Sequence, residues 1–172
     1  MVATILLTAL LAATPTPAMA GMNHPPAACA GAPAPLPPEL QGWRSQVPVR
    51  AAGTVARAAP LPIGQGALAT LLPTPKVAYA VRPEKPGGSV SRGGLFAFTV
   101  GEAGRYRVAL GSGAWIDVLA GSAPVPSVAH GHGPDCSGVR KMVDFDLRPG
   151  RYVLQVAGNG GATLPLMVTR LP

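Results

Sequence analysis

The chain has 172 residues, of which 48% are hydrophobic and 12% are charged, and its formal net charge is +7. Nucleic-acid-binding proteins gather their positive charge in a stripe or cluster, often interleaved with aromatic residues. Here the 14 lysine and arginine residues stand singly or in pairs, so the sequence predicts no nucleic-acid partner. The charge instead indicates solubility and a mild attraction to anionic glycans or lipid head groups.

The first 20 residues, MVATILLTALLAATPTPAMA, have the pattern of a cleaved signal peptide. An apolar run (5–13) is followed by a Pro-Thr-Pro break and by Ala18-Met19-Ala20, the small-x-small pattern that a signal peptidase cuts. The apolar run is too short for a membrane span, which needs about 20 residues. We therefore expect a periplasmic or secreted protein that starts near Gly21 and has no transmembrane span after signal cleavage.

The segment after the signal, residues 21–42, is dense in proline and alanine and has no apolar period. Such a segment buries too little apolar surface to offset the entropy lost on ordering it, so an extended Pro-rich N-terminal arm is predicted. The remaining residues, 43–172, are enough for a single domain with one core. Trp43 is expected to pack under the first strand of that domain.

From Gln46 onward, apolar and polar residues alternate in short runs that glycine and proline turns separate. In the run 141–147, for example, the pattern places Phe145 inward and Asp144 and Asp146 in water. No helical period longer than two turns is found. The pattern predicts an all-β fold, an antiparallel β-sandwich or jelly roll. Strands are expected around 47–49, 68–72, 77–81, 94–100, 105–111, 115–120, 141–147, 151–157 and 164–171.

The later strands also follow one another in a recognisable order. The runs "GLFAFTV", "GRYRVALG", "WIDVLA" and "LRPGRYVLQV" resemble the bacterial pre-peptidase C-terminal type of β-sandwich across residues 93–171. The members of that family are accessory or binding modules attached to secreted enzymes, so the resemblance implies a non-catalytic role. This chain departs from the family pattern by inserting a histidine-bearing segment before the strand at 141–147.

The chain has two cysteines, and in an exported protein the simplest prediction is a Cys29–Cys136 disulfide. The bridge would attach the arm to the sandwich and gather three imidazoles at one junction. Because imidazole is a good ligand for copper and zinc, we expect one of these metals to bind there. The predicted ligands are His24, His130 and His132.

Three other interpretations of this cluster remain open at this stage. The disulfide can be purely structural, with the histidines in a solvated loop. If the cysteines are reduced, both thiolates and Met22 could bind copper instead. The His130-Gly131-His132 segment is also similar to the H-x-H that opens the metal motif of cupin dioxygenases such as homogentisate 1,2-dioxygenase. That resemblance would imply iron, but it covers only His130 and His132, since the motif's glutamate and later histidine have no counterpart.

No other catalytic pattern is evident, because the chain has no G-x-S-x-G elbow and no phosphate-binding glycine loop. Asp117 shares a mostly inward face with Trp115, so it is expected either to pair with Arg140 or Lys141 or to act as a ligand. Taken together, the residues predict an exported, non-catalytic binding or accessory protein that binds copper or zinc. The alternative is a glycan or cell-envelope partner module that uses Trp115, Asp117, Arg140 and Lys141 to contact an anionic envelope component.

Overall fold

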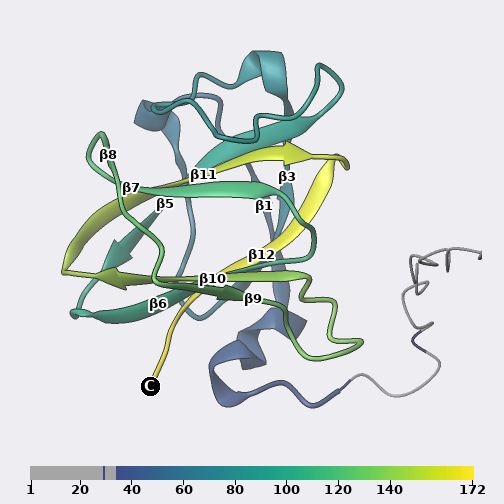
Figure 1. Ribbon diagram of the computed structural model, residues 1–172, viewed down its shortest axis with the longest axis vertical. Helices are drawn as coiled ribbons and strands as arrows, with labels where there is room; N and C mark the ends of the chain where they lie inside the picture. Colours follow the sequence, from purple (N-terminus) through teal and green to yellow (C-terminus); the bar gives the residue numbers. More distant parts are fainter. Residues whose placement is uncertain (1–28, 30–33) are drawn as a thin grey trace, which may run out of the picture.

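Two β-sheets pack face to face as the layers of a sandwich in the computed structural model, which describes residue 29 and residues 34–172 (Figure 1). The predicted all-β sandwich is therefore confirmed. Within the described residues, the first sheet contains six strands in the spatial order β1 (Gln46–Arg50), β3 (Gly66–Thr70), β12 (Thr163–Arg170), β6 (Gly104–Leu110), β10 (Lys141–Leu147) and β9 (Ala129–Gly131). The second runs β2 (Ala59–Pro60), β5 (Arg92–Val100), β11 (Gly150–Asn159), β7 (Trp115–Ala120) and β8 (Ala123–Pro124), while β4 (Leu72–Pro73) pairs with β5.

Most neighbouring strands are antiparallel, as predicted, but two pairs at the sheet edges are not. β1 runs parallel to β3, and β2 runs parallel to β5. The first case arises because the chain leaves β1, crosses to the other sheet to form β2, and returns as β3. Both sheets are therefore mixed, which the alternation of side chains alone does not reveal.

The main core lies between the sheets and follows the period-two pattern of the sequence. Phe96 and Phe98 of β5 and Tyr152 and Leu154 of β11 all point into it, and each is at most 7% exposed. Phe98 and Tyr152 are register partners whose rings stack with centroids 5.6 Å apart. Burial of each such side chain contributes about 1.5–3 kcal/mol, so this interior is the main source of the fold's stability.

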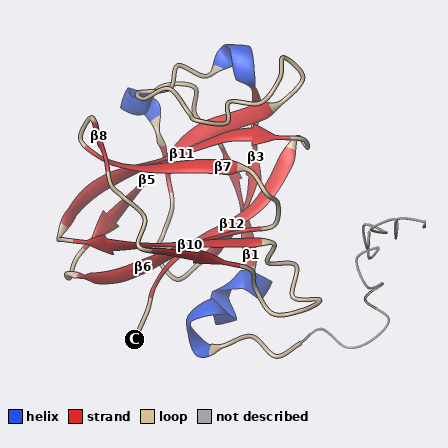
Figure 2. Ribbon diagram, viewed as in Figure 1, coloured by secondary structure: helices blue, strands red, loops and turns tan. Residues whose placement is uncertain are grey.

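A 3₁₀ helix, η1 (Pro38–Arg44), covers the outer face of the first sheet (Figure 2). Its Leu40 and Trp43 are buried against Met167 of β12, and the Trp43 Nε1–H donates a hydrogen bond to the Ser137 carbonyl at 3.2 Å. The C-terminal end of the predicted arm is thus packed on the sheet. This cover also explains why the prediction for Asp144 is wrong, since its side chain is buried under the helix rather than solvated.

The outer face of the second sheet is covered by loops and by two further 3₁₀ helices, η2 (Val55–Arg57) and η3 (Thr74–Lys76) (Figure 2). The strand predicted at 77–81 is not formed. This segment is apolar because it packs on Leu119 and its neighbours. It bonds to a side chain instead of a strand: Gln155 Oε1 accepts from the Ala80 and Val81 N–H groups at 2.6 and 3.3 Å.

Candidate binding cleft

A cleft of about 610 Å³ opens at one edge of the sandwich, between β7 and β8 of one sheet and β9 and β10 of the other. Figure 1 shows β7 and β10 facing each other across this edge. The edge is open because β8 pairs only with Leu119 and Ala120, which leaves the start of β7 without a strand on that side. The cleft gathers six of the residues that the sequence analysis singled out: Trp115, Asp117, His130, His132, Arg140 and Lys141.

Trp115 lines the cleft, and two lysine ammonium groups lie over its ring. The Nζ of Lys141 is 5.4 Å from the ring centroid and that of Lys85 is 5.7 Å from it, so both are within cation–π distance. Lys141 Nζ also donates a hydrogen bond to the Ala114 carbonyl at 2.9 Å. In the described part of the chain, neither ammonium lies within ion-pair distance of a carboxylate.

Asp117 lies on the same face of β7 as Trp115, but this face is the outer one and not the inner one that the sequence predicted. Its strand neighbours Ile116 and Val118 fill the main core. The Asp117 carboxylate accepts hydrogen bonds from the Trp115 indole N–H at 3.0 Å and from the Gln155 amide at 3.3 Å. Asp117 thus holds the indole in place and is not paired with Arg140 or Lys141.

The electrostatics of the cleft are dominated by positive charge. Burial lowers the pKa of Lys141, and repulsion from Lys85 lowers this pKa further, whereas Asp117 opposes the shift. Arg140 lines the same cleft, and among the described lining residues Asp117 is the one carboxylate. Two ammonium groups brought together in this way repel each other and favour a bound negative charge.

The histidines also line the cleft, on β9 and the loop that follows it. The His132 Nδ1–H donates to the Arg140 carbonyl at 2.8 Å, and this leaves Nε2 as the nitrogen that can bind a ligand. His130 lies opposite Val143 in the β9–β10 register. Among the described residues, no three histidine, cysteine, aspartate or glutamate side chains are grouped to hold a metal ion. The third predicted ligand, His24, lies outside the described residues.

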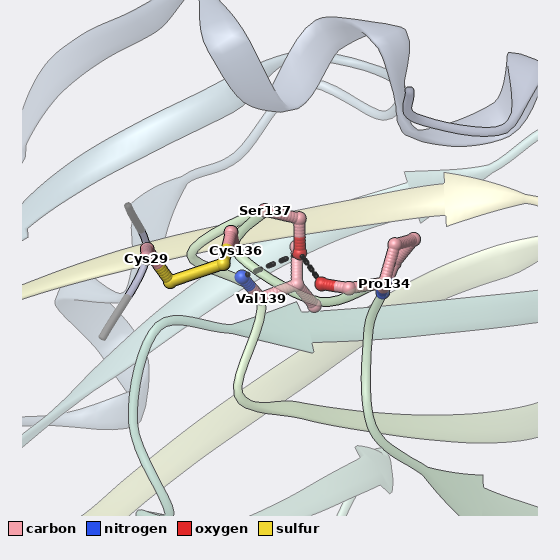
Figure 3. Close-up of a disulfide and its surroundings, with 5 residues drawn as sticks. All are labelled: Cys29, Pro134, Cys136, Ser137 and Val139. Atoms are coloured by element: carbon pink, nitrogen blue, oxygen red, sulfur yellow. Dashed lines mark hydrogen bonds between the residues drawn. A yellow bond between two sulfur atoms is a disulfide. The ribbon is translucent and has the colours of Figure 1, made fainter. Parts of the chain in front are cut away.

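The predicted disulfide between Cys29 and Cys136 is confirmed, with the two Cα atoms 5.5 Å apart (Figure 3). It attaches the arm to the loop that follows His132. The loop is held locally, because the Ser137 hydroxyl donates to the Pro134 carbonyl at 2.6 Å and accepts from the Val139 N–H at 3.2 Å. Since both sulfur atoms are bonded to each other, the alternative in which reduced cysteines act as copper ligands is not realised in this structure.

A second hollow, of about 830 Å³, lies near the C-terminus and is a weaker candidate. Its main charged residues, Arg105 and Asp146, are both exposed and pair with each other at 2.9 Å. Among its described lining residues there is no aromatic side chain and no lysine, in contrast to the first cleft.

Lys85 is the one cleft residue central to this geometry that sequence reasoning missed. It lies in the glycine- and proline-rich loop before β5, far from β7 and β10 in the chain, and a lone lysine in a loop carries no signal of its own.

Within the described residues, no helix has the length and apolar character needed to cross a membrane. Comparison with protein-family models and with curated proteins found no match.

Proposed function

We propose that the chain is an exported, non-catalytic binding or accessory protein whose cleft holds an anionic component of the cell envelope. The observation that carries this proposal is the pair of ammonium groups, Lys85 and Lys141, held over Trp115 without a carboxylate partner among the described residues. Arg140 adds a third positive charge at the same cleft. The only carboxylate described there, that of Asp117, already binds Trp115 and Gln155.

Two further features support export and a binding role. The disulfide between Cys29 and Cys136 is of a kind that persists in oxidising compartments, which fits the signal-like first 20 residues. The sequence runs across residues 93–171 resemble those of the pre-peptidase C-terminal modules. Such modules bind rather than catalyse, which favours a binding role for the cleft.

The test is a binding measurement on the purified protein that starts at Gly21. The probes are vesicles of phosphatidylglycerol and phosphatidylcholine mixed, vesicles of phosphatidylcholine alone, and polygalacturonate. We expect binding to at least one anionic probe, weakening as salt increases. Lys141→Met removes a charge from the cleft, and Lys76→Met removes the same charge from an exposed site elsewhere. The first should lower affinity at least roughly tenfold and the second less than about twofold. Equal affinities in the two variants, or no binding to any anionic probe, would contradict the proposal.

Copper or zinc binding is a second candidate function, and one observation favours it. The bond from His132 Nδ1 to the Arg140 carbonyl fixes the ring and presents Nε2, as ligating histidines are usually held. His130 lines the same cleft, and His24 would be the third ligand. The nearby lysine and arginine charges work against a dication, so this candidate ranks below anion binding.

The metal candidate is tested by titrating Cu²⁺ or Zn²⁺ into the same protein, with metal content measured after dialysis. His132→Ala should then reduce affinity by at least roughly tenfold, and a comparable loss is expected in His24→Ala. A stoichiometry below one metal per chain, or an unchanged affinity in His132→Ala, would reject it. Iron-dependent turnover that is lost in His130→Ala would instead favour the dioxygenase alternative.

A further inference from the structure

We propose that the ligand of the cleft is an amphipathic organic anion, with a carboxylate or phosphate head at the lysines and an apolar body against the side of the core. This inference rests on the proposed anion-binding function and adds the chemical class of the ligand. It follows because a single cavity has an apolar inner wall and a cationic rim.

The inner wall of the cleft is part of the hydrophobic core. Ile116 of β7 and Val143 and Phe145 of β10 line the cleft, and all three side chains belong to the core cluster between the sheets. Val125, from the segment between β8 and β9, is partly buried and packs against the same cluster. At this open edge of the sandwich, an apolar group that enters the cleft therefore meets side chains of both sheets.

The rim of the cleft is cationic. Its two lysines come from different sheets. Lys85 lies in the loop before β5 of the second sheet, and Lys141 is the first residue of β10 in the first sheet. A free inorganic anion would satisfy this rim but leave the apolar wall in contact with water. A neutral sugar would need hydrogen-bond acceptors as well as donors, and the Asp117 carboxylate is already engaged. A ligand that is anionic at one end and apolar at the other matches both surfaces.

The segment between β8 and β9, which contributes Val125 and Ser127 to the lining of the cleft, is bonded to both sheets. The segment from Val125 to Val128 crosses from one sheet to the other, and the N–H at each end donates a strand-like hydrogen bond at 2.8 Å. Val125 donates to the Val118 carbonyl of β7, and Val128 donates to the Asp144 carbonyl of β10. The cavity is thus bounded by a pinned segment, and a volume of about 610 Å³ is in the range of small-molecule sites.

The test compares probes that separate head from body, each kept below its micelle concentration. Decanoate and decyl phosphate carry both parts, acetate and inorganic phosphate carry only the anionic head, and decyl maltoside carries the apolar body with an uncharged sugar head. Binding is followed by isothermal titration calorimetry and by tryptophan fluorescence, to which Trp115 in the cleft and Trp43 under η1 both contribute. Each buried methylene improves affinity roughly fourfold, so three buried methylenes should separate decanoate from acetate by roughly 50-fold or more.

A matched pair of variants tests the position of the apolar body. Val125→Phe enlarges a side chain that lines the cleft, while Val128→Phe adds the same bulk to an exposed side chain that is outside the lining. We expect the first variant to weaken decanoate binding at least roughly tenfold with acetate unaffected, and the second to change neither. Circular dichroism is the check that both variants are folded. Should Val125→Phe fail to fold, Pro124→Phe, at the neighbouring exposed lining position, replaces it.

Each outcome has a defined meaning for the two proposals. Tighter binding of decanoate or decyl phosphate than of the matching head alone supports the amphipathic ligand. Whichever of the two binds more tightly then indicates whether the head group is a carboxylate or a phosphate. Equal, lysine-dependent binding of decanoate and acetate overturns it and leaves anion binding intact. Decyl maltoside that binds as tightly as decanoate also overturns it, and so does polygalacturonate that displaces decanoate at lower concentration. If no anion binds at all, the proposed function itself fails.

Discussion

Arg107 of β6 and Asp144 of β10 are register partners whose side chains form a two-pronged ion pair, with Nε–Oδ1 and Nη2–Oδ2 distances of 2.8 Å. The pair lies beneath η1, whose Glu39 carboxylate is 3.5 Å from Arg107 Nη1. Hydrogen bonding to Asp144 raises the pKa of Arg107, so the guanidinium stays charged although it is largely buried. This cluster connects the helix to the middle of the first sheet.

Replacing Asp144 with alanine should destabilise the fold substantially, because Arg107 would keep its charge in a largely buried place. A loss of about 2–4 kcal/mol in the free energy of unfolding is expected, as for other broken buried pairs. The matched control is Asp146→Ala, two residues along the same strand, where the pair with Arg105 is exposed and should contribute less than about 1 kcal/mol. Urea denaturation measures both. Similar losses in the two variants would show that burial of the first pair is not decisive.

Gln155 is the second buried polar residue on which the fold depends, since it is fully buried and its amide bonds both to the 77–81 segment and to Asp117. Gln155→Leu leaves these partners unsatisfied, so a loss of about 1–3 kcal/mol is expected in urea denaturation. The released segment leads to Lys85, and binding of decanoate should therefore weaken severalfold. Gln46→Leu, at an exposed position where the amide donates one hydrogen bond to the Trp43 carbonyl at 3.3 Å, should lower stability by less than about 1 kcal/mol. A Gln155→Leu variant with unchanged stability would contradict this role.

The strands could be predicted wherever one face is buried in the main core, because alternation then reports burial directly. The runs around Phe96, Phe145 and Leu154 are examples, and each forms the expected strand. The failures occur where the outer face of a sheet is also covered. The alternation of residues predicts a solvated Asp144, but η1 covers that side chain. The 77–81 run has the composition of a strand, but its N–H groups donate to the Gln155 side chain and not to a neighbouring strand. Such covers come from distant segments that carry no periodic signal.

Part of the cleft could be predicted from the sequence for similar reasons. His130, His132, Arg140 and Lys141 lie close together in the chain, so a shared location was a local inference, and the structure brings them to one cleft with Trp115. Lys85 was missed because its approach to Trp115 depends on how a long loop crosses the second sheet. The role of each residue in binding stays a prediction.

Removing the disulfide should lower stability without abolishing the sandwich. The bridge joins residues 107 positions apart, and in the chain-entropy model a closed loop of that size stabilises by about 4.7 kcal/mol at most. Cys29→Ser with Cys136→Ser is expected to lose part of this, roughly 2–4 kcal/mol, in urea denaturation. The unmodified protein in dithiothreitol should unfold at the same urea concentration as the double variant. Equal stability of the oxidised protein and the double variant would show that the bridge does not stabilise the fold.

The affinity for an anion should fall at alkaline pH because Lys141 loses its proton earlier than an ordinary lysine. Burial and the Lys85 charge hold its pKa below the usual 10.5, with Asp117 opposing them. Between the lowered pKa and 10.5 the unfolded chain binds more protons than the folded one, so stability of the free protein rises with pH there. The bound anion favours protonated Lys141, so affinity changes in the opposite direction.

Calorimetry with decanoate from about pH 8 upward tests this, since the range lies above the one in which histidine charge ordinarily changes. The protein as it is should lose affinity severalfold as the pH rises through the lowered lysine pKa. Lys141→Arg keeps its charge throughout, because an arginine guanidinium does not deprotonate in this range, so its affinity should fall less. If the two proteins show the same pH profile, the charge on Lys141 is not what holds the anion, and Lys85 or Arg140 would have to carry it.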